Sequence, residues 1–169
     1  MKEDKADITV IAKSMSAGFY PISGILISDE IAGCVKKGEH GSTFGGNSLA
    51  MAIAKRSVEL LYEEKMIENS AKMGAYLNEQ VNGIQSYLIK DVRGRGLFQG
   101  VEFDHSAKVS ANDLSTICLE NGLLSKATHD YVLRLTPALV ITKTQVDEGI
   151  EILSKSIKQL EQLNEERSK

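Results

Sequence analysis

The apolar positions near the start of the chain fall in two short, unbroken runs. DITVIA and GILIS are rich in β-branched residues and are separated by turn residues around Pro21. Runs that are apolar on both faces are typical of buried, parallel strands, and we predict two such strands here. The first run ends at Lys13, the only charged residue between Ile8 and Gly24.

Two helical patterns follow the strands. Leu49, Ile53, Leu60 and Leu61 recur at helical spacing, which predicts a helix of about fifteen residues with Asn47 or Ser48 as its N-cap. A break near 64–67 separates it from a second helix over roughly 67–81, whose apolar stripe is Met73, Leu77 and Val81. The two helices together are expected to bridge two lobes.

From Tyr87 onward the pattern changes to short β-like runs. YLIKDV, GLFQGVEF, GLLSKA and YVLRLT are separated by glycine or charged turns, and a helix is predicted near 112–120 between the second and third runs. From Thr144 apolar residues recur at three- and four-residue steps, predicting an amphipathic helix whose polar end, EQLNEERSK, frays into solvent. These elements predict a small α/β unit.

Composition narrows the classes of function. A chain of 169 residues can bury one full core or two small lobes. Its net charge of −3, with acidic and basic residues mixed along the chain, gives no field that would attract nucleic acid or an anionic membrane. It contains no apolar run near the ~18 residues that a spanning helix needs, and its charged start does not resemble a signal peptide.

Cysteine and histidine usage adds two expectations. Cys34 and Cys118, without a secretory signal, are expected to be free thiols in a reducing compartment. The three histidines lack partners at metal-ligand spacing, so no metal site is predicted.

Lys13 is the first candidate for covalent chemistry. A lysine becomes a nucleophile toward aldehydes when its ammonium is desolvated or lies near other cations, because both lower its pKa. Its position after a predicted buried strand favours this interpretation, and its small neighbours would let a planar ring approach the backbone. The alternative is a lysine that ends a strand and extends into solvent.

The loop GEHGSTFGGN is the second candidate. Its glycines let backbone N–H groups converge on an anion, while Ser42 and Thr43 supply hydroxyl donors just before a predicted helix N-terminus. It is not a Walker loop, and glycine-rich turns are often only turns. Glu39 and His40 could act as acid and base, or simply order the loop.

Arg134 is the third candidate. In YVLRLTP its apolar neighbours predict a poorly hydrated guanidinium, which needs an anion: either a substrate carboxylate or a structural ion pair. The stretch RGRG at 93–96 lacks dinucleotide-binding spacing and is interpreted as a turn between strands.

Taken in order, KSMSAGFYPIS, KGEHGSTFGGNSLA, DVRGRGLFQGVEF and KATHDYVLRLTPALVIT resemble the class III, pyridoxal-phosphate-dependent aminotransferases over nearly the whole chain. The T-H-D stretch is most similar to the ornithine aminotransferases within that family. The resemblance implies the carboxy-terminal part of a fold type I pyridoxal-phosphate-dependent transferase. Residues 1–66 would be a remnant of the large cofactor-binding domain, 67–84 a connecting helix, and 85–169 the small α/β domain.

The resemblance also implies roles for the candidates. Lys13 would be the Schiff-base lysine and proton shuttle. Ser42 and Thr43 would bind the cofactor, with Thr43 reaching the phosphate held by a neighbouring subunit of a homodimer. Arg134 would bind the α-carboxylate of glutamate. The implied reaction transfers the δ-amino group of ornithine to 2-oxoglutarate, in arginine catabolism and proline biosynthesis.

The sequence departs from the family pattern in several places. Alanine replaces glycine at Ala12 and Ala17, and proline is replaced at Ser48, Ala127 and Ala138. Ala17 would crowd a backbone approach if its φ is positive. The stretches that in the family carry the main phosphate loop, the pyridine-binding aspartate and a second substrate arginine have no counterpart here.

We therefore expect a truncated or split enzyme that is inactive alone, unless a second chain complements it. Alternatives are a non-catalytic module that dimerises with a full-length paralogue through the helix after Asn47, or another class III enzyme such as an acetylornithine aminotransferase. The expected compartment is the cytoplasm, or the mitochondrial matrix if the chain is eukaryotic.

Overall fold

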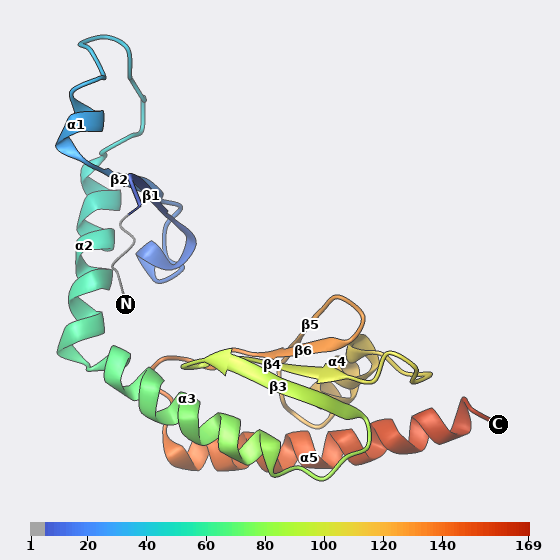
Figure 1. The fold of residues 1–169 in the computed structure, drawn as a ribbon. Coiled ribbons are helices and arrows are strands. Elements are labelled where there is room, and N and C mark those ends of the chain that lie inside the picture. The colour runs from blue at the N-terminus through green and yellow to red at the C-terminus, as the bar shows by residue number, and fades with distance from the viewer. Residues whose placement is uncertain (1–5) are drawn as a thin grey trace. The chain divides into compact units, whose positions relative to one another are not determined.

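The computed structural model describes residues 6–169 and divides the chain into two compact units. The first unit ends at Glu64, and the second runs from Lys65 to Lys169. Figure 1 shows the helices and strands of each unit.

A two-stranded antiparallel ribbon forms the start of the first unit. Strand β1 (Ile8–Ile11) pairs with β2 (Gly24–Ile27), with Ile8 opposite Ile27. The prediction of two strands is confirmed, but the prediction that they are buried and parallel is wrong. The connection between them, 12–23, holds only one short 3-10 helix and no α-helix of the kind that usually links parallel strands. Val10 and Leu26 are 70% and 60% exposed, so neither face of the ribbon is covered by the described residues.

A short 3-10 helix, η1 (Lys13–Ser16), follows β1 and contacts helix α2. Ser16 is buried, and its hydroxyl donates a hydrogen bond to the carbonyl of Tyr20 and accepts one from its N–H. After β2 comes a single helical turn, α1 (Asp29–Ala32), and then the glycine-rich loop.

Helix α2 (Ser48–Glu63) confirms the predicted helix and its N-cap. The Asn47 side chain accepts a hydrogen bond of 2.9 Å from the N–H of Ala50, which satisfies one of the free donors of the first turn. The buried residues of α2 are alanines, Ala50 and Ala54. Small side chains on this face allow η1 to approach closely.

A four-stranded antiparallel sheet forms the centre of the second unit. It has the order β3 (Ile89–Arg95), β4 (Phe98–Phe103), β6 (Val132–Leu135) and β5 (Lys126–Thr128). Along β4 the buried residues Gln99, Val101 and Phe103 alternate with more exposed ones. Such alternation is typical of a sheet with one covered face.

Three helices share a hydrophobic core with the sheet. Helix α3 (Met66–Asn82) contacts β3 and β4, helix α4 (Ala111–Glu120) contacts β5 and β6, and helix α5 (Lys143–Glu166) contacts both helices (Figure 1). Helices α4 and α5 begin with reciprocal capping boxes at Ser110 and Thr142. The sheet and the helices of this unit, α3 included, share one core.

The turn between β3 and β4 is shorter than predicted. Strand β3 continues through Arg95, and only Gly96 and Leu97 form the turn, with Gly96 at φ +55°. The stretch RGRG is therefore mostly strand. Gly74 of α3 lies directly against Gly96, because a Cβ at position 74 would stand 2.2 Å from the Gly96 carbonyl.

The end of α5 does not fray as predicted. Ser86 donates a hydrogen bond of 2.7 Å to Glu161, and the N–H of Lys108 donates one of 2.8 Å to Asn164. Arg167 forms two hydrogen bonds of 3.1 Å to the carboxylate of Asp113 on α4. These polar side chains therefore fix the helix end to the rest of the unit, which a polar composition alone does not reveal.

Candidate functional site

Lys13 lies at the start of η1 and is exposed in this chain. Its backbone has φ +53°, a left-handed conformation that non-glycine residues rarely adopt. Such conformations are concentrated at functional sites, where the surrounding structure enforces them. The expected desolvated setting is not present here, because the strand that precedes Lys13 is itself exposed.

Two residues with a left-handed backbone lie in the segment after Lys13. Ala17 has φ +52° and the following Gly18 has φ +79°. The left-handed conformation costs a non-glycine residue roughly 1–2 kcal/mol. The condition under which Ala17 crowds the backbone, a positive φ, is therefore met.

The glycine-rich loop is held by its own side chains. The Glu39 carboxylate accepts a hydrogen bond of 2.7 Å from the N–H of Lys36, and the Ser42 hydroxyl accepts one of 2.9 Å from the N–H of Gly45. Glu39 thus orders the loop, one of the two roles considered for it. Gly45 must be glycine, because a Cβ there would stand 2.8 Å from the Cβ of Ser42.

Thr43 lies at the exposed part of this loop, four residues before the N-cap of α2. Among residues 6–169, no hydrogen bond engages its hydroxyl. The Ser42 hydroxyl, in contrast, already accepts a bond within the loop. A hydroxyl that accepts one bond can still donate another, so both predicted hydroxyls keep an O–H donor, and Thr43 is the one that forms no hydrogen bond within residues 6–169.

Arg134 lies in the middle of β6 and is half-buried. Its Nε is buried and has no hydrogen-bond partner, and its guanidinium carbon stands 5.8 Å from the centre of the Phe98 ring. Within the described part of the chain no carboxylate lies within ion-pair distance of it. The alternative interpretation, a structural ion pair, therefore finds no partner in residues 6–169.

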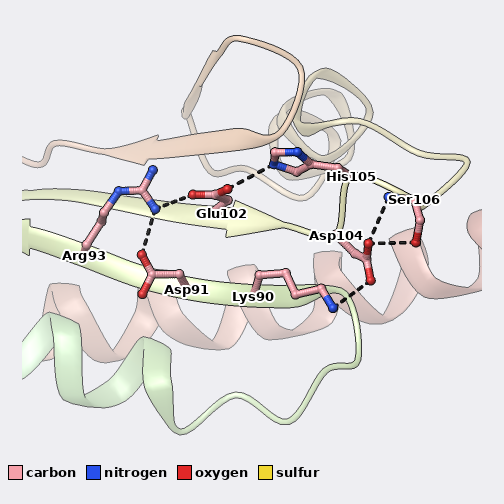
Figure 2. A network of polar contacts seen from close by, with 7 residues as sticks. All are labelled: Lys90, Asp91, Arg93, Glu102, Asp104, His105 and Ser106. Atoms are coloured by element: carbon pink, nitrogen blue, oxygen red, sulfur yellow. Dashed lines mark hydrogen bonds and ion pairs between the residues drawn. The ribbon is translucent and has the colours of Figure 1, made fainter.

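Arg93 shows what a structurally paired arginine looks like in the same sheet. Figure 2 shows its guanidinium directed at Asp91, at 2.7 Å, and at Glu102, whose other oxygen lies 3.0 Å from Nε2 of His105. These hydrogen bonds raise the pKa of Arg93 above its ordinary value, Asp91 having the larger effect, and lower that of Glu102. Arg93 is thus already satisfied, whereas Arg134 is not.

A pocket of about 290 Å³ opens beside Arg134 within the second unit. Its lining is mostly leucine, isoleucine and valine, with Lys126 and Arg134 as its charged residues and no aspartate or glutamate. Sequence reasoning missed Lys126. Its position beside Arg134 depends on the register of β5 against β6, which a run of six residues does not specify.

The candidates are distributed over both units. Lys13, Ser42 and Thr43 belong to the first unit, and Arg134 belongs to the second. In the described residues no group of three His, Cys, Asp or Glu side chains is arranged to hold a metal ion. Across the same range, no helix combines the length and the apolar character needed to cross a bilayer.

Comparison with known proteins identifies the family. The family model described as aminotransferase class-III matches residues 1–157. The chain is a class III aminotransferase family member. It is 40% identical over 151 residues to the mitochondrial ornithine aminotransferase of Drosophila melanogaster, and 43% identical over 158 residues to the ornithine aminotransferase of Plasmodium falciparum. These matches cover 89% and 91% of this chain, which spans only 35% and 37% of the relatives' length.

Solved structures agree with this assignment. An ornithine aminotransferase from Toxoplasma gondii, which has partial occupancy of PLP at its active site, matches 96% of this chain with a TM-score of 0.87 and 38% identity. An acetylornithine aminotransferase from Elizabethkingia anophelis matches 92% of it with a TM-score of 0.86 and 37% identity. The chain covers 38% and 41% of those structures. The predicted fold class and family are confirmed.

Proposed function

We propose that this chain supplies Lys13, Thr43 and Arg134 to a pyridoxal-phosphate-dependent transaminase of the ornithine aminotransferase type. The reaction transfers the δ-amino group of ornithine to 2-oxoglutarate and yields glutamate 5-semialdehyde and glutamate. The observation that carries the proposal is 40–43% identity to ornithine aminotransferases over about nine tenths of the chain. Those relatives are ornithine aminotransferases, which points to ornithine as the amino donor.

The donor set of the chain fits this cofactor. Lys13 offers an exposed primary amine for an aldehyde, and Thr43 offers a free hydroxyl in a glycine-rich loop for a phosphate. When bound, pyridoxal phosphate supplies a conjugated ring that accepts electrons from the bonds of the reacting carbon. Lys13 would hold the cofactor and move the proton at that carbon.

Arg134 would bind a substrate carboxylate. No hydrogen bond or ion pair engages its guanidinium within residues 6–169, so its terminal N–H groups are left for a planar carboxylate, which can engage two of them side by side. The Phe98 ring beneath the guanidinium limits its rotation and favours one orientation. The role of this residue is therefore to position the substrate rather than to transfer a proton.

The 169-residue polypeptide by itself should have little or no transaminase activity. It spans little more than a third of its relatives, and apolar side chains that a complete core would cover are exposed on β1, β2 and α2. Association with a second copy, or with a chain that supplies the remaining part, would cover them. Tyr62 of α2, which is 69% exposed, is one such residue.

The test is turnover in a complemented assembly. The chain is mixed with the remaining, amino-terminal part of a related ornithine aminotransferase, and glutamate 5-semialdehyde is measured with its cyclised product. Activity in the mixture that is lost with Lys13→Met and retained with Lys36→Met supports the proposal. Equal activity of the Lys13→Met assembly would refute it.

A second function, acetylornithine transamination, is favoured by the likeness to the Elizabethkingia anophelis enzyme. The same assembly distinguishes the two, because N-acetylation of ornithine removes the charge of its α-amino group and adds bulk. A kcat/KM that is higher for ornithine supports the first function, and one that is higher for N-acetylornithine supports the second. As for compartment, we propose the cytoplasm, although the Drosophila relative is named as mitochondrial.

A further inference from the structure

Lys126 and Arg134 are direct partners across neighbouring antiparallel strands. The register pairs Lys126 of β5 with Arg134 of β6. Residues that are directly opposite in an antiparallel pair project from the same face of the sheet. Both residues line the pocket of about 290 Å³ in the second unit, and their side chains project from the face of the sheet opposite to the buried Leu133.

Neither cation is neutralised within the described residues. No carboxylate of residues 6–169 lies within ion-pair distance of Lys126 or Arg134, and the pocket lining contains no acidic residue. Three other cations of this unit, in contrast, are paired: Arg93 with Asp91, Lys90 with Asp104, and Arg167 with Asp113. Two adjacent, unpaired cations repel each other, and an anion between them removes that repulsion.

We propose that Lys126 is a specificity-determining residue that, together with Arg134, binds the carboxylate end of the oxo-acid or amino-acid substrate. The inference rests on the proposed function, in which Arg134 binds a carboxylate, and it adds a second cation to that role. Lys126 increases affinity for the anionic end of the substrate without taking part in proton transfer. A substrate with two carboxylates gains more from it than a substrate with one.

Binding of glutarate, an unreactive dicarboxylate, to the full 169-residue chain tests the proposal. The nitrogen-15 resonance of the Arg134 Nε–H reports binding at a single atom, because this N–H has no partner in the free chain. Glutarate is expected to move that resonance. Lys126→Met is expected to raise the dissociation constant about threefold to tenfold at low salt, as loss of one screened charge near the ligand would do.

Three comparisons separate this role from a structural one. Lys126→Arg should restore binding, because it keeps the charge. The matched control Lys158→Met removes an exposed lysine of α5 that does not line the pocket, and should leave binding unchanged. At about 0.5 M salt the Debye length falls to about 4 Å, so the difference between wild type and Lys126→Met should shrink toward nothing.

The outcomes also separate this inference from the proposed function. Equal affinity of wild type and Lys126→Met at low salt, with binding lost in Arg134→Met, would overturn the role of Lys126 and leave that of Arg134. No movement of the Arg134 resonance at any glutarate concentration would overturn both. A weakening in Lys126→Met that does not depend on salt would also overturn the proposal, because it would indicate a structural effect.

Discussion

Replacement of Gly74 by alanine should destabilise the second unit, although alanine is the better helix former. Gly74 lies inside α3, where a change from glycine to alanine gains about 1 kcal/mol from helix propensity alone. The new methyl group, however, would stand 2.2 Å from the carbonyl carbon and oxygen of Gly96, where an ordinary contact needs 3.4 Å or more. Helix and hairpin must separate to make room.

The size of the destabilisation depends on which atoms the new methyl group at position 74 must displace. Overpacking against movable side chains costs about 1–3 kcal/mol. Here the obstacle is backbone at a two-residue turn whose Gly96 has φ +55°, so it cannot rotate out of the way. We therefore take the overpacking cost as about 3 kcal/mol. Subtracting the gain of about 1 kcal/mol from helix propensity leaves a net loss of about 2 kcal/mol in the free energy of unfolding.

Gly149→Ala is the matched control. Gly149 also lies inside a helix, α5, but a Cβ there would meet only Leu123 Cδ1 at 3.9 Å, an ordinary contact. This variant should be more stable by about 0.5–1 kcal/mol.

Urea unfolding followed by circular dichroism at the helix band measures both variants. With a slope near 1 kcal/mol per molar, the midpoints of the two variants should differ by about 2–3 M. If Gly74→Ala unfolds at the same urea concentration as Gly149→Ala, the close approach of α3 to the hairpin is not as described.

Three further predictions concern other parts of the chain. Ala17→Gly should stabilise the first unit by about 0.5–1 kcal/mol in thermal unfolding, because it relieves a left-handed alanine; a loss of stability would contradict this. Arg167→Met should cost about 0.5–1 kcal/mol at pH 7. Burial opposes ionisation of Asp113, but its bonds with Arg167 and with Ser110 leave its pKa below the ordinary value. The ion pair therefore stabilises the protein at pH values above the unfolded pKa of Asp113, about 4, and this stabilisation is lost as the pH falls through the lower pKa of the folded state. The stabilities of Arg167→Met and wild type should therefore converge at low pH; a constant difference would be evidence against the ion pair. Iodoacetamide should modify exposed Cys34 faster than buried Cys118, whose thiol pKa is raised by burial; equal rates would contradict the burial.

The four long helices, α2 to α5, could be predicted from the sequence to within a residue or two, whereas the short α1 and η1 were not predicted. Helix α2 begins after Asn47 as predicted, and α3 covers 66–82 where 67–81 was predicted. Helical periodicity and N-caps are local signals, so they are visible in a single sequence.

Features that depend on distant residues could not be predicted. The apolar runs that form β1 and β2 have the composition of buried strands. Whether such strands pair parallel or antiparallel, and whether other side chains bury them, depends on residues far away in the sequence. The end of α5 was expected to fray because its residues are polar, yet Asp113, which pairs with Arg167, lies 54 positions away in sequence.

The candidate site was predicted only in part. Lys13, Thr43 and Arg134 were identified from motifs, because a motif is a short stretch that can be recognised in the sequence alone. Lys126 was missed, because its relation to Arg134 is one of strand register. Likewise, the contrast between the paired Arg93 and the unpaired Arg134 is visible only once the carboxylates around each are located.

Borohydride reduction shows which lysine holds pyridoxal phosphate, because it fixes the cofactor to the amine that carries it. The assembly of this chain with the amino-terminal part of a related ornithine aminotransferase is incubated with the cofactor, reduced, digested and mapped by mass spectrometry. A pyridoxyl group is expected on the peptide that contains Lys13, and none in the Lys13→Met assembly. A label spread evenly over other lysines, or absent from Lys13, would contradict this expectation.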